Sequence, residues 1–94
     1  MEERILTRHP DARKRGVNIS RAKYETVRAA ILAALDDGDL TFEELMEAVN
    51  RKLAGRFDGS ISWYVTTVKL DLEARGIIAR VPKSSPQRLR LASE

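Results

Sequence analysis

Cysteine is absent from the chain of 94 residues, and histidine occurs once, as His9. Without cysteine the chain has no disulfide, no thiolate nucleophile and no thiolate-bound zinc or iron–sulfur cluster. One histidine is too few for a multi-histidine metal site and argues against a Ser-His-Asp triad. Walker loops, dinucleotide-binding glycine patterns and nucleophile elbows are missing too. We therefore expect no enzyme activity, no catalytic residue, no cofactor and no small-molecule substrate.

Long apolar runs are also missing. The longest one, Ala29 to Leu35, has seven residues, whereas a membrane-spanning helix needs about 20. The first residues are acidic and polar, unlike a secretory signal. Hydrophobic residues make up 43% of the chain and charged residues 33%, which suits one small domain. We expect a cytoplasmic protein without a membrane partner.

Three aspartates, Asp36, Asp37 and Asp39, lie close together in the sequence. With Asp37 and Asp39 as the first and third ligands, the calcium-loop pattern requires glycine where this chain has Phe42. We interpret the aspartates as solvated loop residues and expect no metal site.

The charges are segregated along the chain, although the net charge is only +3. Lys and Arg outnumber Asp and Glu by seven to three in residues 1–23 and by four to one in residues 76–94. Residues 24–75 carry six cations against ten acids. The basic ends and the acidic middle bear on the choice of partners rather than on the fold.

Three helices are predicted from capping residues and apolar spacing. Ser20 can cap a helix over residues 21–36, whose apolar residues recur at intervals of three and four. Thr41 and Glu44 match a capping box for a second helix that ends before Gly55. Asp58 or Ser60 can cap a third helix that runs to Arg75.

Two short strands are predicted after the helices, over residues 77–81 and 87–91, with a loop at residues 82–86. Helices followed by a hairpin give a mainly α fold of the winged helix-turn-helix type, in which the hairpin is the wing. We expect this single domain to cover residues 17–94, and residues 1–16 to be a basic, flexible leader.

Four stretches also carry a resemblance: Gly16–Ser20, Gly59–Tyr64, Val68–Arg75 and Pro86–Leu91. In these motifs the chain resembles a small bacterial family of uncharacterised winged-helix-like proteins, and the similarity covers nearly the whole sequence. The resemblance implies the fold, and it brings no activity, cofactor or functional residues with it.

The third helix has two apolar stripes. Ile61, Tyr64, Val65, Val68 and Leu72 fall on one arc of the helical wheel and are expected in the core. The second stripe permits three interpretations: packing against the hairpin or the leader, a homodimer or partner contact with the tryptophan as anchor, or contact with a base or sugar. Its residues are Trp63, Thr67, Leu70 and Ala74.

Hydroxyls and cations give the candidate contacts to DNA phosphates and base edges. The third helix has few base-reading groups, and its Asp71 and Arg75 are spaced to pair with each other. The basic groups of the hairpin and the leader can equally be a solvated face, a protected strand edge or a solvated tail. The candidates are Ser60, Ser62, Thr66 and Lys69 on the helix, Arg80, Lys83, Arg88 and Arg90 on the wing, and Arg13, Lys14 and Arg15 in the leader.

These patterns favour a small winged-helix DNA-binding or regulatory protein that holds duplex DNA mainly through phosphate contacts. The alternative is a winged-helix module for protein–protein interaction or homodimerisation that does not bind DNA.

Overall fold

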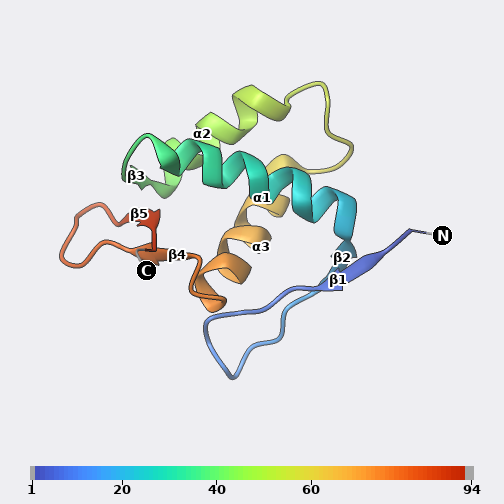
Figure 1. The fold of residues 1–94 in the computed structure, drawn as a ribbon, viewed down its shortest axis with the longest axis horizontal. Coiled ribbons are helices and arrows are strands. Elements are labelled where there is room, and N and C mark those ends of the chain that lie inside the picture. Colours follow the sequence, from blue (N-terminus) through green and yellow to red (C-terminus); the bar gives the residue numbers. More distant parts are fainter. Residues whose placement is uncertain (1, 93–94) are drawn as a thin grey trace.

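The computed structural model describes residues 2–92 of the chain. These residues form three helices and five short strands (Figure 1). The helices are α1 (Arg21–Asp36), α2 (Phe42–Leu53) and α3 (Ile61–Ala74). The strands are β1 (Arg4–Leu6), β2 (Asn18–Ser20), β3 (Leu40–Thr41), β4 (Ile78–Arg80) and β5 (Arg88–Leu91). The chain is therefore a small domain of helices with two antiparallel sheets.

The predicted helix starts are confirmed by their caps. The Ser20 hydroxyl accepts a hydrogen bond from the Lys23 backbone N–H at the start of α1. At the start of α2, Thr41 and Glu44 form both bonds of a capping box. Ser60, one of the two candidates for the third cap, accepts the Trp63 N–H. Each cap provides a partner for an N–H group that the helix itself leaves unpaired.

The core lies where the three helices meet the larger sheet. The central part of the predicted α3 stripe, Val65, Val68 and Leu72, is fully buried. Ile61 and Tyr64, at the N-terminal end of that stripe, are only half-buried and pack against the core from its edge. None of the helices in residues 2–92 has the length and the apolar character that crossing a bilayer requires.

The predicted hairpin is part of a three-stranded sheet with the order β3-β5-β4. Leu40 and Thr41 of β3 pair with Leu89 and Arg88 of β5. The sequence did not predict β3, because two residues show no alternation and tertiary pairing alone makes them a strand. Within β5 the predicted alternation is confirmed, since Leu89 is buried while Arg88 and Arg90 are exposed.

Residues 4–20 fold back on themselves as a ribbon, although we expected a flexible leader up to residue 16. Strand β1 pairs antiparallel with β2, so that Ile5 lies opposite Ile19. The Thr7 N–H donates to the Val17 carbonyl at 2.8 Å, and Thr7 is buried. A Cβ on Gly16 would lie 1.7 Å from the Thr7 carbonyl oxygen, so only glycine permits this close approach. The ribbon thus crosses the predicted domain boundary between residues 16 and 17.

Figure 1 shows how these parts surround α3. Helix α1 crosses in front of α3, and the loop between β4 and β5, which we call the wing loop (residues 81–87), extends from one side of the molecule. The loop between β1 and β2, which we call the leader loop (residues 7–17), lies beside the C-terminal half of α3.

Candidate nucleic-acid interface

The leader loop is held to the helices by one buried carboxylate. Asp71 of α3 is fully buried. It accepts the Arg8 backbone N–H at 2.8 Å and the Tyr24 hydroxyl at 2.5 Å. The predicted Asp71–Arg75 pair is confirmed, with 2.9 Å between the Arg75 Nε and the carboxylate. This one side chain therefore joins the leader loop, α1 and α3.

The phenol of Tyr24 is the neutral donor of this cluster. Burial, and after it the hydrogen bond to the Asp71 carboxylate, together raise the pKa of Tyr24 to about 12. Both causes favour the protonated phenol, because ionisation would place two negative charges side by side in a buried site.

Alkaline pH should weaken the fold through this phenol. The folded-state pKa of Tyr24 lies above the ordinary value of 10, so its contribution is complete below pH 10 and is lost as the pH rises towards 12. We expect the free energy of unfolding to fall by about 1 kcal/mol more between pH 9 and pH 11 in the natural protein than in Tyr24→Phe. Urea unfolding at both pH values measures the difference. Equal losses in the two proteins would contradict the assignment.

The candidate groups on α3 are mostly engaged in local contacts. The Ser60 hydroxyl serves the cap and lies 3.2 Å from the Ser62 hydroxyl. The Thr66 hydroxyl donates to the Ser62 carbonyl at 2.9 Å. These three residues remain exposed. The polar side chains that this part of the helix offers to an external ligand are therefore short hydroxyls.

Lys69 is withdrawn from solvent, which the sequence did not predict. Its side chain is 14% exposed, and its ammonium group pairs with Glu73 at 2.5 Å and lies 5.4 Å from the centre of the Phe42 ring. Glu73, whose side chain is 8% exposed, also pairs with Arg80 of β4 at 3.2 Å. Lys69 and Arg80 thus share one carboxylate, which reduces the charge that either can offer to a phosphate.

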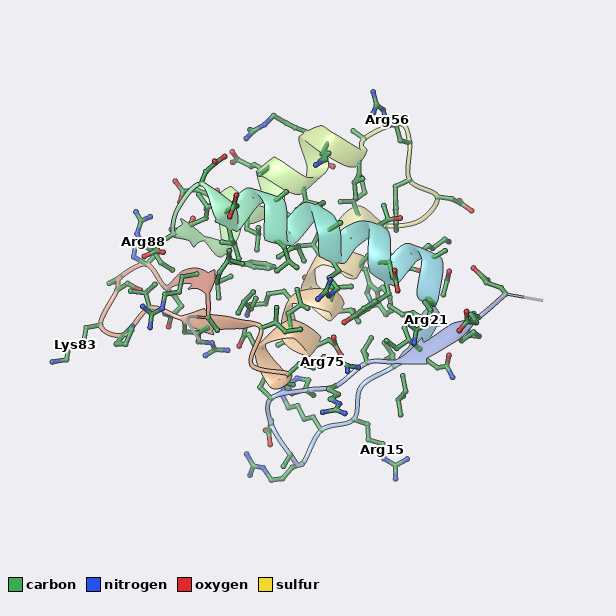
Figure 2. All side chains as sticks on the ribbon, viewed as in Figure 1. Arg15, Arg21, Arg56, Arg75, Lys83 and Arg88 are labelled. Atoms are coloured by element: carbon green, nitrogen blue, oxygen red, sulfur yellow. The ribbon has the colours of Figure 1, made fainter. Side chains whose placement is uncertain are left out.

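The hairpin of β4 and β5 carries the other candidate cations in the C-terminal part of the chain. Arg88 lies 3.6 Å from the Glu44 carboxylate and 3.4 Å from the Asp39 carbonyl. Lys83 and Arg90 are exposed and form no ion pair within residues 2–92. Figure 2 shows Lys83 extending outwards from the wing loop, with Arg88 on the same side of the molecule.

The wing loop is shaped by its own hydrogen bonds. The Ser84 hydroxyl donates to the Val81 carbonyl at 3.0 Å and accepts the Arg88 N–H at 2.9 Å. The Gln87 amide also donates to the Val81 carbonyl at 3.0 Å. These bonds fix the loop that carries Lys83, so its charge is presented by an ordered scaffold.

The candidate cations of the leader lie on the leader loop. Arg13 pairs with Asp11 at 3.2 Å, and this hydrogen-bonded contact lowers the pKa of the Asp11 carboxyl. Lys14 and Arg15 are exposed and form no ion pair in the part of the chain that the structure describes. Figure 2 places Arg15 and Lys83 on opposite sides of the C-terminal end of α3. The leader loop and the wing loop thus flank this helix as separate basic groups.

The second apolar stripe of α3 has an exposed end and a covered end. The Trp63 side chain is 46% exposed, and its ring packs edge-to-face on Tyr64 at a centroid distance of 5.0 Å. Thr67 and Leu70 are half-buried and face the leader loop across a pocket of about 90 Å³. Ala74 is half-buried at the end of the helix. The structure brings the middle of this stripe to the leader loop and leaves the tryptophan accessible.

Sequence reasoning predicted only the pairing of Asp71 with Arg75 and did not predict that Asp71 is buried. A signal was available in Tyr24, which lies on the buried stripe of α1. A buried tyrosine hydroxyl usually finds a hydrogen-bond partner, and a carboxylate is the strongest acceptor among the side chains. The identity of that partner depends on how α1 packs against α3, which the sequence pattern does not specify.

Comparison with models of known protein families matches residues 4–89 to a family of unknown function, DUF6958. Neither the curated proteins nor the solved structures include a significant match to the chain.

Proposed function

The chain belongs to the DUF6958 family, and we propose that it is a winged-helix protein that binds duplex DNA through phosphate contacts. The order of three helices followed by a hairpin supports the winged-helix assignment. The short strand β3 between α1 and α2 supports it further, because it ties the start of α2 to the hairpin. In this assignment α2 and α3 form the helix-turn-helix, and β4, β5 and their loop form the wing.

The observation that carries the proposal is the exposed basic side of the wing. Lys83 and Arg90 lack ion-pair partners within residues 2–92, and Arg88 stands beside them on β5 with only an exposed carboxylate nearby. Exposed cations on an ordered hairpin suit the phosphate oxygens of a duplex, which attract positive charge at every step of the helix. Arg13, Lys14 and Arg15 of the leader loop supply a second basic group.

The composition of α3 supports phosphate contact rather than base readout. Its exposed hydroxyls are short, and its lysine is paired with Glu73. Specific readout in the major groove commonly uses arginine, lysine, asparagine or glutamine side chains that reach two atoms of a base. We therefore propose binding with little sequence preference, in the cytoplasmic location that the sequence led us to expect.

A salt series tests the proposal. With about five phosphates neutralised, the slope of log affinity against log salt should be roughly −4.5, and affinity should fall about 500-fold between about 50 and 200 mM salt. Arg88→Ala with Arg90→Ala should flatten the slope by up to about two units, equally for unrelated duplexes, because phosphates carry no sequence information. Fluorescence anisotropy with labelled duplexes measures both effects.

A matched control is available on α2. Arg51 and Lys52 are exposed in its last turn, so the double variant Arg51→Ala with Lys52→Ala changes the net charge by the same amount. This control should keep the slope of the natural protein. An equal flattening in both double variants would mean that only the overall charge matters, and it would contradict a site on the wing.

A second candidate function is a protein-interaction module that does not bind DNA. The observation that favours it is the exposure of Trp63, since tryptophan is frequent at the centres of protein interfaces. Absence of duplex binding at about 50 mM salt and micromolar protein would favour this module over the DNA-binding function.

A further inference from the structure

The face of α3 opposite the core carries no charged residue, and it is exposed at Trp63 and bordered by the leader loop at Thr67 and Leu70. We call Trp63, Thr67, Leu70 and Ala74 the α3 seam. These residues carry no charge, and they lie on the side of α3 away from its buried residues Val65, Val68 and Leu72. Large apolar groups on such a face indicate an interaction surface, because a lone helix face gains nothing from exposing an indole to water.

A pocket lies beside the same seam. Thr67 and Leu70 line it together with Val17 of the leader loop, and its volume is about 90 Å³. Pockets for drug-sized ligands have about 300 to 1,000 Å³, whereas a closed cavity of about 150 Å³ holds one benzene ring. The pocket is therefore of the right size for part of one aromatic side chain and too small for a typical metabolite.

The rim of the pocket is basic. Arg8, His9 and Arg15 line it, and no acidic side chain does. A guanidinium group is attracted to the face of an aromatic ring, and the indole of tryptophan is the strongest partner for it. The pocket thus suits the edge of an indole ring in its apolar lining and in its electrostatics.

The α3 seam carries both an indole and a pocket that can take part of one. The seam of one copy can therefore fit against the seam of a second copy. Trp63 and Leu70 are seven residues apart, or about 10 Å along the helix axis. In an antiparallel pair of α3 helices related by a two-fold axis, each Trp63 lies opposite the other copy's Leu70. The smaller side chain of Thr67 then lies near the axis. Self-complementarity of one patch is what a two-fold dimer requires.

We propose that a second copy of this chain occupies the α3 seam, with the edge of each Trp63 ring in the pocket between α3 and the leader loop of the other copy. The charges do not oppose this pairing, because the seam itself is neutral and the two basic rims lie on opposite sides of the axis. The dimer does not require DNA, so it stands or falls independently of the function proposed above.

Sedimentation equilibrium between about 1 µM and 1 mM protein tests the dimer. We expect a reversible monomer–dimer equilibrium that Trp63→Ala weakens about 30-fold or more, with its helical circular dichroism unchanged. Leu6→Ala is the matched control, because Leu6 is 65% exposed on β1 and lies outside the seam. This control should associate as the natural protein does. A natural protein that remains monomeric at 1 mM would overturn the proposal, as would equal dimerisation of Trp63→Ala.

Two further measurements distinguish this seam from any other dimer contact. Trp63 is the only tryptophan, so its emission should shift to shorter wavelength as the protein concentration rises. Thr67→Glu and Thr67→Lys should each dimerise poorly, because like charges meet near the axis, and an equimolar mixture of the two should regain the dimer. Association without the emission shift, or a mixture that stays monomeric, would show that the seam is not the contact.

Discussion

Val68→Asp should leave the chain unfolded at 25 °C. Val68 is fully buried between α3 and the other helices, and an isolated carboxylate at such a position has neither a counter-ion nor water around it. The cost is several kcal/mol, against a total stability of about 5 to 15 kcal/mol for a domain of this kind. Leu72→Asp should have the same effect, since Leu72 is equally buried on the same stripe.

Far-UV circular dichroism during thermal unfolding measures this loss. Thr66→Asp is the matched control, because Thr66 lies on the same helix but is exposed, and this variant should keep its cooperative transition. An unchanged melting temperature in Val68→Asp would show that the buried face of α3 has been assigned wrongly.

Asp71→Ala should cost about 3 to 5 kcal/mol, the usual result of removing one member of a buried ion pair. The substitution leaves the Tyr24 hydroxyl, the Arg8 N–H and the Arg75 guanidinium without their shared acceptor. For a domain of this size the melting temperature should fall by at least about 12 °C. The leader loop loses its bond to α3, so amide hydrogen exchange should also become faster at Arg8.

Two variants separate the role of the carboxylate from a general effect of charge. Asp71→Asn retains an acceptor oxygen and should be less destabilising than Asp71→Ala. Asp37→Ala removes an exposed aspartate next to the end of α1 and should leave the melting temperature nearly unchanged. If Asp71→Ala behaved like Asp37→Ala, the buried cluster would not hold the leader loop in place.

The helices could be predicted from the sequence because their signals are local. Ser20, Thr41 with Glu44, and Ser60 each bond to backbone groups within three residues. Such caps act within one turn and do not depend on the rest of the fold. The boundaries of α1 and the start of α2 therefore match the sequence prediction.

The short strands could not be predicted in the same way. Strands β1, β2 and β3 have only two or three residues each, which is too short to show an alternating pattern. Their pairing depends on residues that are distant in sequence, as for Leu40 and Leu89. The leader was interpreted as flexible for this reason, although its backbone bonds to β2 and to Asp71.

In the candidate site, too, contacts within one helix could be predicted from the sequence, whereas contacts between different elements could not. The i,i+4 pair of Asp71 and Arg75 follows from spacing on one helix. The contacts of Lys69 with Phe42 and of Arg88 with Glu44 join different elements, and only the folded chain brings them together. Sequence reasoning could name the candidate cations, but it could not say which of them have carboxylate partners in the folded chain.

The proposed contact between the wing and duplex DNA is tested most directly by NMR titration of the isotope-labelled chain with an unlabelled duplex at about 50 mM salt. We predict that amide shifts change at the wing, over residues 80–90, and at Arg13, Lys14 and Arg15 of the leader loop. The changes should be the same for duplexes of unrelated sequence. Shifts confined to other surfaces, or none with protein and duplex both at micromolar concentrations or above, would contradict the proposed binding of DNA by the wing.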